Sequence, residues 1–269
     1  MPRRFAYWIG LRVADRFYRR DAYGRSAVIS NLRHILEFKG VRPSEETLEK
    51  LARRTFQYFG KYLVDFFRFT RMSRAEVDRI VSIEHPEYID QARALGRGGL
   101  AVSAHLGSSE IAGAVVVALG LPLNAVVLPE SDQKINALFQ SRREGRGLKV
   151  IPLGHAARGT LKALKNKEWA ALLADRDYSA RNDLVHFFGA PARLPRGPVA
   201  LCVKTGAPIL PTFLLRQDDD TFLLRFHSPI IPHGSSSFLD IQGQICKILE
   251  QEIGERPSQW FMFEEFWKN

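Results

Sequence analysis

The first 80 residues have the spacing of apolar positions that α-helices show. Between residues 44 and 69, apolar side chains recur three or four positions apart, and Ser44 followed by Glu45 and Glu46 is typical of a helix start. This stretch holds more aromatic residues than one buried helix face needs, so core packing and an apolar groove are both open uses for them. The positions of the apolar stripe are Leu48, Leu51, Ala52, Phe56, Phe59, Leu63 and Phe66.

From about residue 98 the pattern changes to short apolar runs that alternate with helical segments. Short runs bounded by turn residues predict strands, and the longer stretches between them predict helices. This alternation predicts an α/β fold, with a mixed central sheet flanked by helices and preceded by the amino-terminal helical region. The predicted strands are 99–104, 123–128, 150–152, 169–174, 209–215 and 222–226, and the predicted helices are 111–119, 132–145, 158–166, 198–205 and 238–253.

A length of 269 residues fits one structural domain. Within it we expect a helical region over residues 1–80 and an α/β core over residues 81–269. The two cysteines, Cys202 and Cys246, lie in apolar runs without metal or redox spacing, which is typical of core residues. This use of cysteine indicates a reducing compartment, which we take to be the cytoplasm.

Positive charge is concentrated at the amino terminus. The chain carries a net charge of +10, and residues 1–33 hold eight arginines against Asp15 and Asp21. Such a region favours an anionic membrane surface or a polyphosphate partner, and nucleic acid is equally compatible with charge alone. The arginines are Arg3, Arg4, Arg12, Arg16, Arg19, Arg20, Arg25 and Arg33.

Aromatic and aliphatic residues lie among these arginines at helical spacing. The pattern predicts a helix in the plane of a bilayer interface, and an ordinary surface helix packed on the domain is the alternative. The chain has no run of about 20 apolar residues, and charged residues interrupt any secretory signal, so we expect peripheral or monotopic membrane contact through residues 1–33. The apolar positions are Phe5, Trp8, Ile9, Val13 and Phe17.

The segment AVSAHLGSSE, residues 101–110, is the most informative for chemistry. A strand delivers His105 to its carboxyl end, Gly107 permits a tight turn, and a serine precedes the next helix. We therefore predict that Glu110 accepts a hydrogen bond from one ring nitrogen of His105. The other nitrogen would take a proton from a hydroxyl, and N–H groups at the helix start would stabilise an oxyanion. A histidine that only ends a strand is the alternative.

Other catalytic and metal-binding patterns are missing from the sequence. The chain has no Gly-x-Ser-x-Gly, no His-Glu-x-x-His and no Cys-x-x-Cys. Residues 154–160 have the spacing of a phosphate-binding loop but lack its lysine. We therefore expect neither a metal ion nor a cofactor.

The segment His105-Leu106-Gly107 to Glu110 resembles the His-x4-Asp/Glu motif of the lysophospholipid (glycerolipid-type) acyltransferase superfamily. It is most similar to the branch that holds the late acyltransferases of lipid A biosynthesis and the mycobacterial phosphatidylinositol-mannoside acyltransferases. That branch usually has asparagine and an aromatic residue where this chain has Ser108 and Ser109.

Four further blocks carry the same resemblance, in the order that the family has them. Arg143 opens an Arg-x3-Gly block, and Asp175 opens an acidic block that is followed by Phe-Phe-Gly at 187–189. Residues 197–211 resemble the fourth block, and residues 256–260 match a Pro-x-Gln-Trp element. The resemblance covers about residue 95 to the end of the chain.

The resemblance implies a glycerolipid acyltransferase-like fold and a direct transfer without an acyl-enzyme. The implied catalytic residues are His105 as general base, Glu110 as its partner and Asp175 as a further member of the relay. A structural contact with Arg176 is the alternative for Asp175. The residues expected to bind substrate are Arg143, Arg176, Phe188 and Gly189, with a surface salt bridge as the alternative for Arg143 and core packing as the alternative for Phe188.

The implied reaction moves a fatty acyl group from a thioester of acyl carrier protein or coenzyme A to a hydroxyl of a membrane lipid. The thioester is a co-substrate rather than a cofactor, and the acceptor is a lipid A-like molecule, a phospholipid or a glycolipid. The expected location is the cytoplasmic face of the inner membrane. The alternatives are a lysophospholipid acyltransferase for ordinary phospholipids and a non-catalytic basic module that binds membranes or nucleic acid. Five ordered blocks favour the enzyme, without a nucleic-acid partner.

Overall fold

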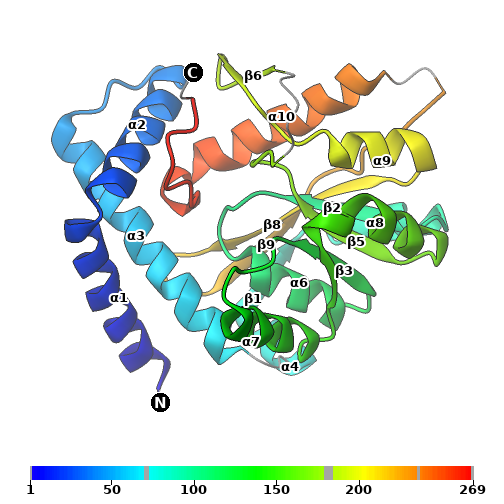
Figure 1. Cartoon of the computed structure of the whole chain (residues 1–269), viewed down its shortest axis with the longest axis horizontal. Helices are drawn as coiled ribbons and strands as arrows, with labels where there is room; N and C mark the ends of the chain where they lie inside the picture. Colours follow the sequence, from blue (N-terminus) through cyan, green and yellow to red (C-terminus); the bar gives the residue numbers. More distant parts are fainter. Residues whose placement is uncertain (1, 70–72, 179–183, 235–236, 268–269) are drawn as a thin grey trace.

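A seven-stranded sheet lies at the centre of the structure, with helices on both of its faces (Figure 1). The computed structural model describes residues 2–69, 73–178, 184–234 and 237–267. The strand order is β1-β9-β8-β2-β5-β3-β4, and the pairs are parallel except for β8 with β9. These strands are β1 (Val81–Glu84), β2 (Gly99–Ser103), β3 (Leu123–Val127), β4 (Lys149–Pro152), β5 (Trp169–Leu173), β8 (Ile209–Arg216) and β9 (Phe222–Phe226), and a separate hairpin pairs β6 (Val185–Phe187) with β7 (Ala190–Ala192).

The predicted helices and strands are present, within a few residues of the expected bounds. Ser44 accepts a hydrogen bond from the Thr47 N–H, which confirms it as the N-cap of α3. The pattern did not assign β1, α5 or the β6–β7 hairpin, which are short. The helices are α1 (Arg3–Arg20), α2 (Ala22–Phe38), α3 (Glu45–Arg68), α4 (Arg74–Ile80), α5 (Glu87–Ala94), α6 (Ser109–Ala118), α7 (Gln133–Glu144), α8 (Ala156–Lys165), α9 (Gly197–Thr205) and α10 (Phe238–Glu255), with 3₁₀ turns η1 (Leu153–His155) and η2 (Pro257–Gln259).

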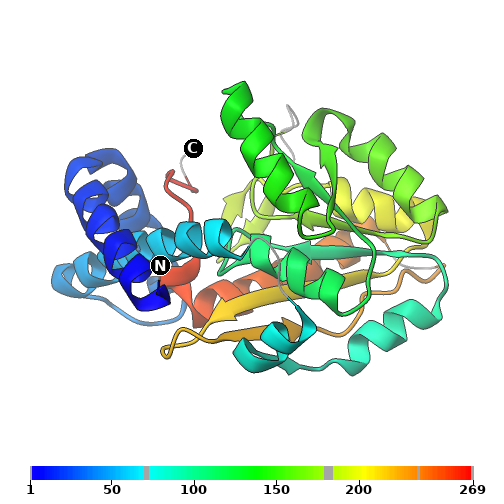
Figure 2. The same cartoon turned by 90° about the horizontal axis from the view of Figure 1, so that it is seen from below.

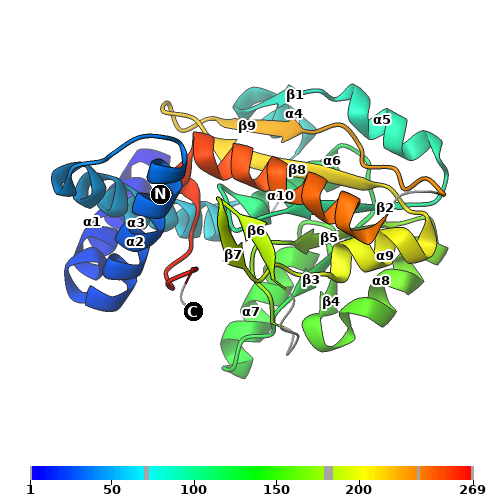
Figure 3. The same ribbon diagram turned by 90° about the horizontal axis from the view of Figure 1, so that it is seen from above.

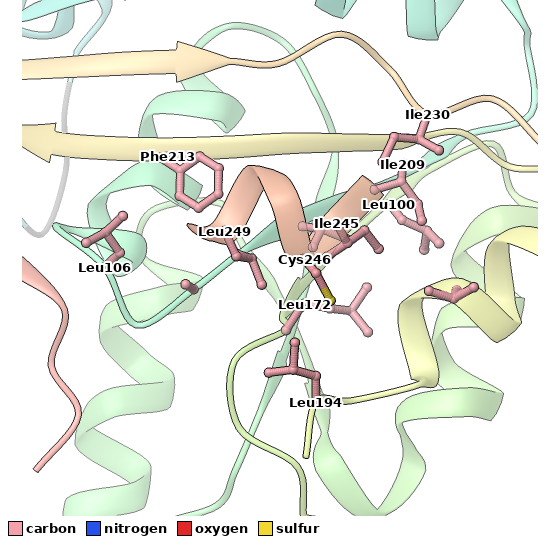
Figure 4. Close-up of a cluster of buried hydrophobic side chains, with 14 of the residues drawn as sticks. Leu100, Leu106, Leu172, Leu194, Ile209, Phe213, Ile230, Ile245, Cys246 and Leu249 are labelled. Atoms are coloured by element: carbon pink, nitrogen blue, oxygen red, sulfur yellow. The ribbon is translucent and has the colours of Figure 1, made fainter. Parts of the chain in front are cut away.

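The sheet separates two hydrophobic cores, because successive side chains of a strand point to opposite faces. In β2, Leu100 and Val102 belong to the core beneath α8, α9 and α10, and Ala101 belongs to the core beneath α4, α5 and α6. Figure 4 shows Cys246 of α10 within the first of these cores, among Leu172, Ile245 and other apolar side chains. Cys202 is buried there too, and burial raises the pKa of its thiol to about 11. Both cysteines are therefore core residues, as their surroundings in the sequence predict.

The helices α1, α2 and α3 lie together beside one end of the sheet, as Figures 1 and 3 both show. α4 ends at Ile80 and β1 begins at Val81. The division into two regions of one domain stays a prediction.

α1 packs on α3 through its smallest side chains. A Cβ atom added to Gly10 would lie 2.9 Å from Val64 of α3, and one added to Gly60 would lie 2.8 Å from the Gly10 carbonyl oxygen. Ala14 is also buried in this contact. Apart from Tyr7, the buried residues of α1 are the small Ala6, Gly10 and Ala14, whereas its large apolar residues Phe5, Trp8, Ile9, Val13 and Phe17 are exposed.

A buried ion pair joins these helices to the sheet. Arg216, the last residue of β8, is 2% exposed and pairs with Asp65 of α3, which is fully buried. The hydroxyl of Tyr7 on α1 donates to Asp65 Oδ1 over 2.7 Å and accepts from Arg216 Nη1 over 3.0 Å. One buried cluster thus connects α1, α3 and the end of β8.

We expect Tyr7→Phe to lower the free energy of unfolding by about 1.5–3 kcal/mol, because hydrogen bonds to charged groups are worth about that much. The ring is kept, and the buried carboxylate of Asp65 loses one donor. Urea unfolding measures the difference.

Tyr18→Phe is the matched control, since the Tyr18 hydroxyl also donates to a carboxylate, that of Glu49, at an exposed position. A loss within about 0.5 kcal/mol is expected there, as for most surface changes. Equal losses in the two variants would contradict a special role for the buried cluster.

Candidate active site

His105 and Asp175 lie at equivalent positions beyond two neighbouring strands. β2 and β5 are parallel, with Ser103 opposite Leu173, so the residues two positions further along each strand also lie side by side. His105 Nδ1 is 2.8 Å from Asp175 Oδ1, and the His105 backbone N–H donates to Asp175 Oδ2 over 2.9 Å. The register of the sheet thus brings the imidazole and the carboxylate together.

The Asp175 carboxylate is fully buried, whereas the His105 side chain is 29% exposed. Burial alone would raise the pKa of Asp175, but the neighbouring His105 ring and three N–H donors outweigh it and hold that pKa below its ordinary value. The third donor is Trp260 Nε1, 2.8 Å from Oδ2. Asp175 is therefore an ionised, fully hydrogen-bonded group beneath a partly exposed imidazole.

Glu110 does not make the contact with His105 that the sequence predicts. It lies in the first turn of α6, as expected, but both of its oxygens accept from Arg143 of α7, with N–O distances between 2.5 and 3.1 Å. The planar guanidinium suits such a two-oxygen contact, and Asp175 already occupies His105 Nδ1. The predicted partner of the histidine is corrected from Glu110 to Asp175.

Gly107 has the role that the motif assigns to it. Its φ is +66°, and a Cβ atom there would lie 2.2 Å from the Leu214 carbonyl oxygen of β8. The Gly107 N–H donates to the Gln259 carbonyl oxygen, and the Ser108 N–H donates to that of Leu214. The turn after His105 is therefore held between β8 and the segment that follows α10.

This carboxyl-terminal segment, residues 257–263, runs beside the motif like a short antiparallel strand. Leu106 pairs with Trp260, and the Phe261 N–H donates to the His105 carbonyl oxygen over 2.8 Å. In Figure 1 the segment is red and lies between α3 and the sheet. The sequence identified the Pro-x-Gln-Trp element but did not predict that it contacts residues 105–108, which form the histidine loop.

Two of the arginines near the end of α7, Arg143 and Arg146, bind protein groups. Arg143, 8% exposed, is paired with Glu110, so it is neither a surface salt bridge nor free for a substrate in this structure. Arg146, 6% exposed, donates to the carbonyl oxygens of Phe66 and Phe69 at the end of α3. Together they join α7, α6 and α3.

Arg176 and the Phe-Phe-Gly turn contact other protein groups in the structure, and their binding of substrate stays a prediction. Arg176 Nη2 donates to the Phe261 carbonyl oxygen over 2.8 Å, so it supports the carboxyl-terminal segment. Phe188 and Gly189, with φ of +49° and +74°, form the two-residue turn between β6 and β7, a shape in which glycine is favoured. The Phe188 side chain is 2% exposed and packs on Phe38, so it belongs to the core and not to an open groove.

Aromatic side chains of α3 and the carboxyl-terminal segment form a continuous cluster beside the motif. The ring centroids of Phe59 and Tyr62 lie 5.3 and 5.6 Å from that of Phe261, and Phe59 also contacts Phe263. Tyr62 bonds to the Ser109 side chain at the start of α6. Phe59, Tyr62 and Phe263 are partly exposed and Phe261 is buried. Because the Phe261 N–H binds the His105 carbonyl oxygen, this aromatic cluster lies beside the histidine.

A polar cleft of about 420 Å³ lies elsewhere, at the carboxyl ends of β1 and β9. Because β9 is antiparallel to β8, these ends lie at the opposite edge of the sheet from His105. The cleft is not part of the candidate site. Within the described ranges, no three or more His, Cys, Asp or Glu side chains form a group that could hold a metal ion.

Comparison with known proteins places the chain among the acyltransferases. It belongs to the family of bacterial lipid A biosynthesis acyltransferases, whose model matches residues 1–269. The chain is 26% identical to a phosphatidylinositol mannoside acyltransferase of Mycobacterium tuberculosis (strain H37Rv), over 97% of this chain and 86% of the relative. It is 23% identical to the protein of that name from Mycolicibacterium smegmatis, over 84% of this chain and 75% of the relative. The resemblance seen in the motifs, the α/β fold and the enzyme class are thereby confirmed.

The two acidic candidates are distinguished by the proton on His105 Nδ1. We expect a downfield resonance for this proton in the NMR spectrum of histidine-labelled protein, because it is held between the ring and a buried carboxylate. Asp175→Asn should abolish the resonance, and Glu110→Gln should leave it in place. Loss in Glu110→Gln alone would return the role of partner to Glu110.

Proposed function

We propose that this acyltransferase moves a fatty acyl group from a thioester of acyl carrier protein or coenzyme A to a hydroxyl of a membrane lipid. The acceptor class is a glycolipid or phospholipid, including lipid A-like molecules. The family and the names of its mannoside-acylating relatives support this class of acceptor. The observation that carries the proposal is the hydrogen bond between the partly exposed His105 ring and the buried Asp175 carboxylate.

His105 acts as the general base in this proposal. Because Nδ1 is bonded to Asp175, Nε2 is the ring nitrogen that takes the proton of the acceptor hydroxyl. The hydroxyl oxygen forms a bond to the thioester carbonyl carbon, the carbon–sulfur bond breaks, and the thiolate receives the proton from the imidazolium. Asp175 stabilises the imidazolium that exists between the two proton transfers.

Glu110 serves the site through Arg143 in this proposal. Their ion pair is largely buried, with side chains 18% and 10% exposed, and it fixes the first turn of α6 against the end of α7. The N–H groups of Gly107 and Ser108 already have carbonyl acceptors, so those of Ser109 and Glu110 are the helix-start donors left for an oxyanion. The pair thus keeps the donors in place beside His105.

The aromatic cluster of α3 and the carboxyl-terminal segment supports an apolar substrate. Phe59 and Tyr62 are partly exposed and pack on the buried Phe261, whose backbone binds His105. A fatty acyl chain would cover this apolar surface in place of water. We assign the acyl-binding surface to this cluster, in place of Phe188.

α1 is proposed to contact an anionic membrane surface. Its buried residues are Tyr7 and three small ones, whereas its exposed face combines large apolar side chains with arginines, which is unlike a helix that only packs on a core. The ring centroids of Phe5 and Trp8 are 5.9 Å apart, and the Arg12 guanidinium lies 5.5 Å from the Trp8 ring. The outward apolar residues are Phe5 (51% exposed), Trp8 (52%), Ile9 (38%), Val13 (49%) and Phe17 (61%).

This contact fits a lipid acceptor whose hydroxyl lies at the level of the headgroups. None of the helices within the described ranges is long and apolar enough to span a bilayer. We propose peripheral or monotopic attachment at the cytoplasmic face of the inner membrane. Figure 2 shows α1 and α2 at one end of the molecule, with α7 projecting from the α/β core.

His105→Ala should lower acyl transfer by at least about 100-fold, the usual contribution of a general base. The Asp175 carboxylate keeps two N–H donors in this variant, so the chain should stay folded. Lipid mass spectrometry of cells with and without the gene measures the transfer, as a lipid that gains one acyl chain.

His155→Ala is the control, because this exposed histidine lies on η1, away from Asp175. If His105→Ala retains the acylated lipid, the histidine is not the base. If charge reversal within residues 3–25 abolishes the cellular function while His105→Ala has no effect, the protein is a non-catalytic basic module.

The double variant Trp8→Ala with Phe17→Ala should bind vesicles of phosphatidylglycerol and phosphatidylcholine at least about tenfold more weakly. Each large side chain contributes about 1.5–3 kcal/mol when it is buried in an apolar phase. Cosedimentation with the vesicles at low and high salt separates the apolar and the electrostatic contributions to binding, since salt weakens the attraction between the arginines and the anionic lipid.

Leu239→Ala is the matched control, since Leu239 is 74% exposed but lies on α10. Equal loss in the control, or vesicle binding unaffected by the α1 changes, would refute a specific contact through α1.

A further inference from the structure

Trp260 is a buried residue whose polar atom points at the candidate catalytic carboxylate. It is 3% exposed, and its indole Nε1 donates to Asp175 Oδ2 over 2.8 Å. Oδ2 also accepts the His105 backbone N–H, and Oδ1 faces the His105 ring. The two oxygens therefore have different partners, and the indole helps to decide which oxygen faces the imidazole.

The position of the indole is fixed from both sides. Gln259 is 3% exposed, and its side-chain amide bonds to both backbone groups of Arg216, as a neighbouring β-strand would. Oε1 accepts from the Arg216 N–H over 2.9 Å, and Nε2 donates to the Arg216 carbonyl oxygen over 2.8 Å. On the other side, Leu106 pairs with Trp260, and Phe261 binds the His105 backbone. Gln259 thus attaches the segment to the end of β8, and the histidine loop attaches it to β2.

We propose that Trp260 is a positioning residue for the acyl transfer. Its indole N–H holds the Asp175 carboxylate in the orientation that keeps Oδ1 on the His105 ring, and it withdraws negative charge from that carboxylate. The inference rests on the proposed function for its place in a reaction, but its physical content concerns the His105–Asp175 pair alone.

Packing alone does not account for this contact. Trp260 packs in a second group of aromatic rings, with its centroid 5.2 Å from that of Phe266 and 6.0 Å from that of Trp267. A phenyl ring at position 260 would preserve much of that contact. The indole N–H adds a bond to a buried charge, where hydrogen bonds are strong and their loss is costly. Without it, Oδ2 keeps the His105 backbone N–H.

The sign of the expected effect follows from the charge on Asp175. Removing the indole N–H leaves more negative charge on the carboxylate, which favours the imidazolium form of His105. A general base must be neutral to accept a proton, so the acid limb of the pH–rate profile should move to higher pH.

Trp260→Phe is the principal test. We expect kcat for acyl transfer to fall by about tenfold, the lower end of what a hydrogen bond to a charged group contributes, with KM for the acyl thioester within about twofold. The acid limb of the pH–rate profile, and the midpoint of the His105 ring titration followed by NMR, should both move to higher pH than in the unaltered chain.

Trp267→Phe is the matched control. Trp267 packs in the same group of rings as Trp260 and Phe266. Its Nε1 donates over 3.1 Å to a neutral acceptor, the Phe187 carbonyl oxygen. It should lose stability but keep the wild-type profile and midpoint. Unchanged midpoints in Trp260→Phe, or equal shifts in the two variants, would overturn the proposal.

A second measurement uses the unaltered chain and does not depend on the variant folding. One of the four tryptophan indole N–H resonances should change with pH at the same midpoint as the His105 ring, and this dependence should vanish in His105→Ala. If none follows the histidine, Trp260 does not sense the pair and the proposal fails. Because both NMR readings need no acyl transfer, they separate this inference from a failure of the proposed function.

Discussion

The hydrogen bond between His105 and Asp175 depends on the parallel register of β2 and β5. Ser103 lies opposite Leu173, so His105 and Asp175, each two residues further along its strand, also lie opposite each other. His105 Nδ1 and Asp175 Oδ1 are 2.8 Å apart. A shift of the register by one residue would turn one of the two side chains to the other face of the sheet. The apolar residues that alternate between the two cores, such as Leu100 and Ala101, therefore also set the geometry of the site.

Two carboxylates lie near the histidine loop, and the fold gives them different partners. Asp175 is fully buried, where a charge is tolerated only with several donors, and it has three. Glu110 is partly exposed and is matched by the guanidinium of Arg143. The separation leaves one acid to act on the imidazole and the other to hold α6 and α7 together.

The sequence predicted most of the fold and part of the site, and the differences have physical reasons. Periodicity located the long helices and the central strands, but it left out β1 and the β6–β7 hairpin, which have only three or four residues in each strand. The motif identified His105 and Gly107. It could not choose between Glu110 and Asp175, because the choice depends on which strands are neighbours, and β5 is inserted between β2 and β3. Trp260 was part of a recognised element, yet its contact with Asp175 spans 85 residues of sequence and left no local signal.

The amino-terminal helices are attached to the same part of the sheet that holds the site. Arg216 ends β8, the strand beside β2, and its side chain binds Asp65 and Tyr7 while its backbone binds Gln259, the neighbour of Trp260. A lipid acceptor fixes the depth of its hydroxyl relative to the bilayer, so the proposed attachment through α1 would require a fixed distance from α1 to His105. Flexible surface contacts would not keep that distance, whereas a buried ion pair with additional hydrogen bonds does, since breaking it costs about 3–5 kcal/mol. Burying the charges of Asp65 and Arg216 costs free energy. The pair therefore serves to fix the position of α1 relative to His105, and not only to stabilise the fold.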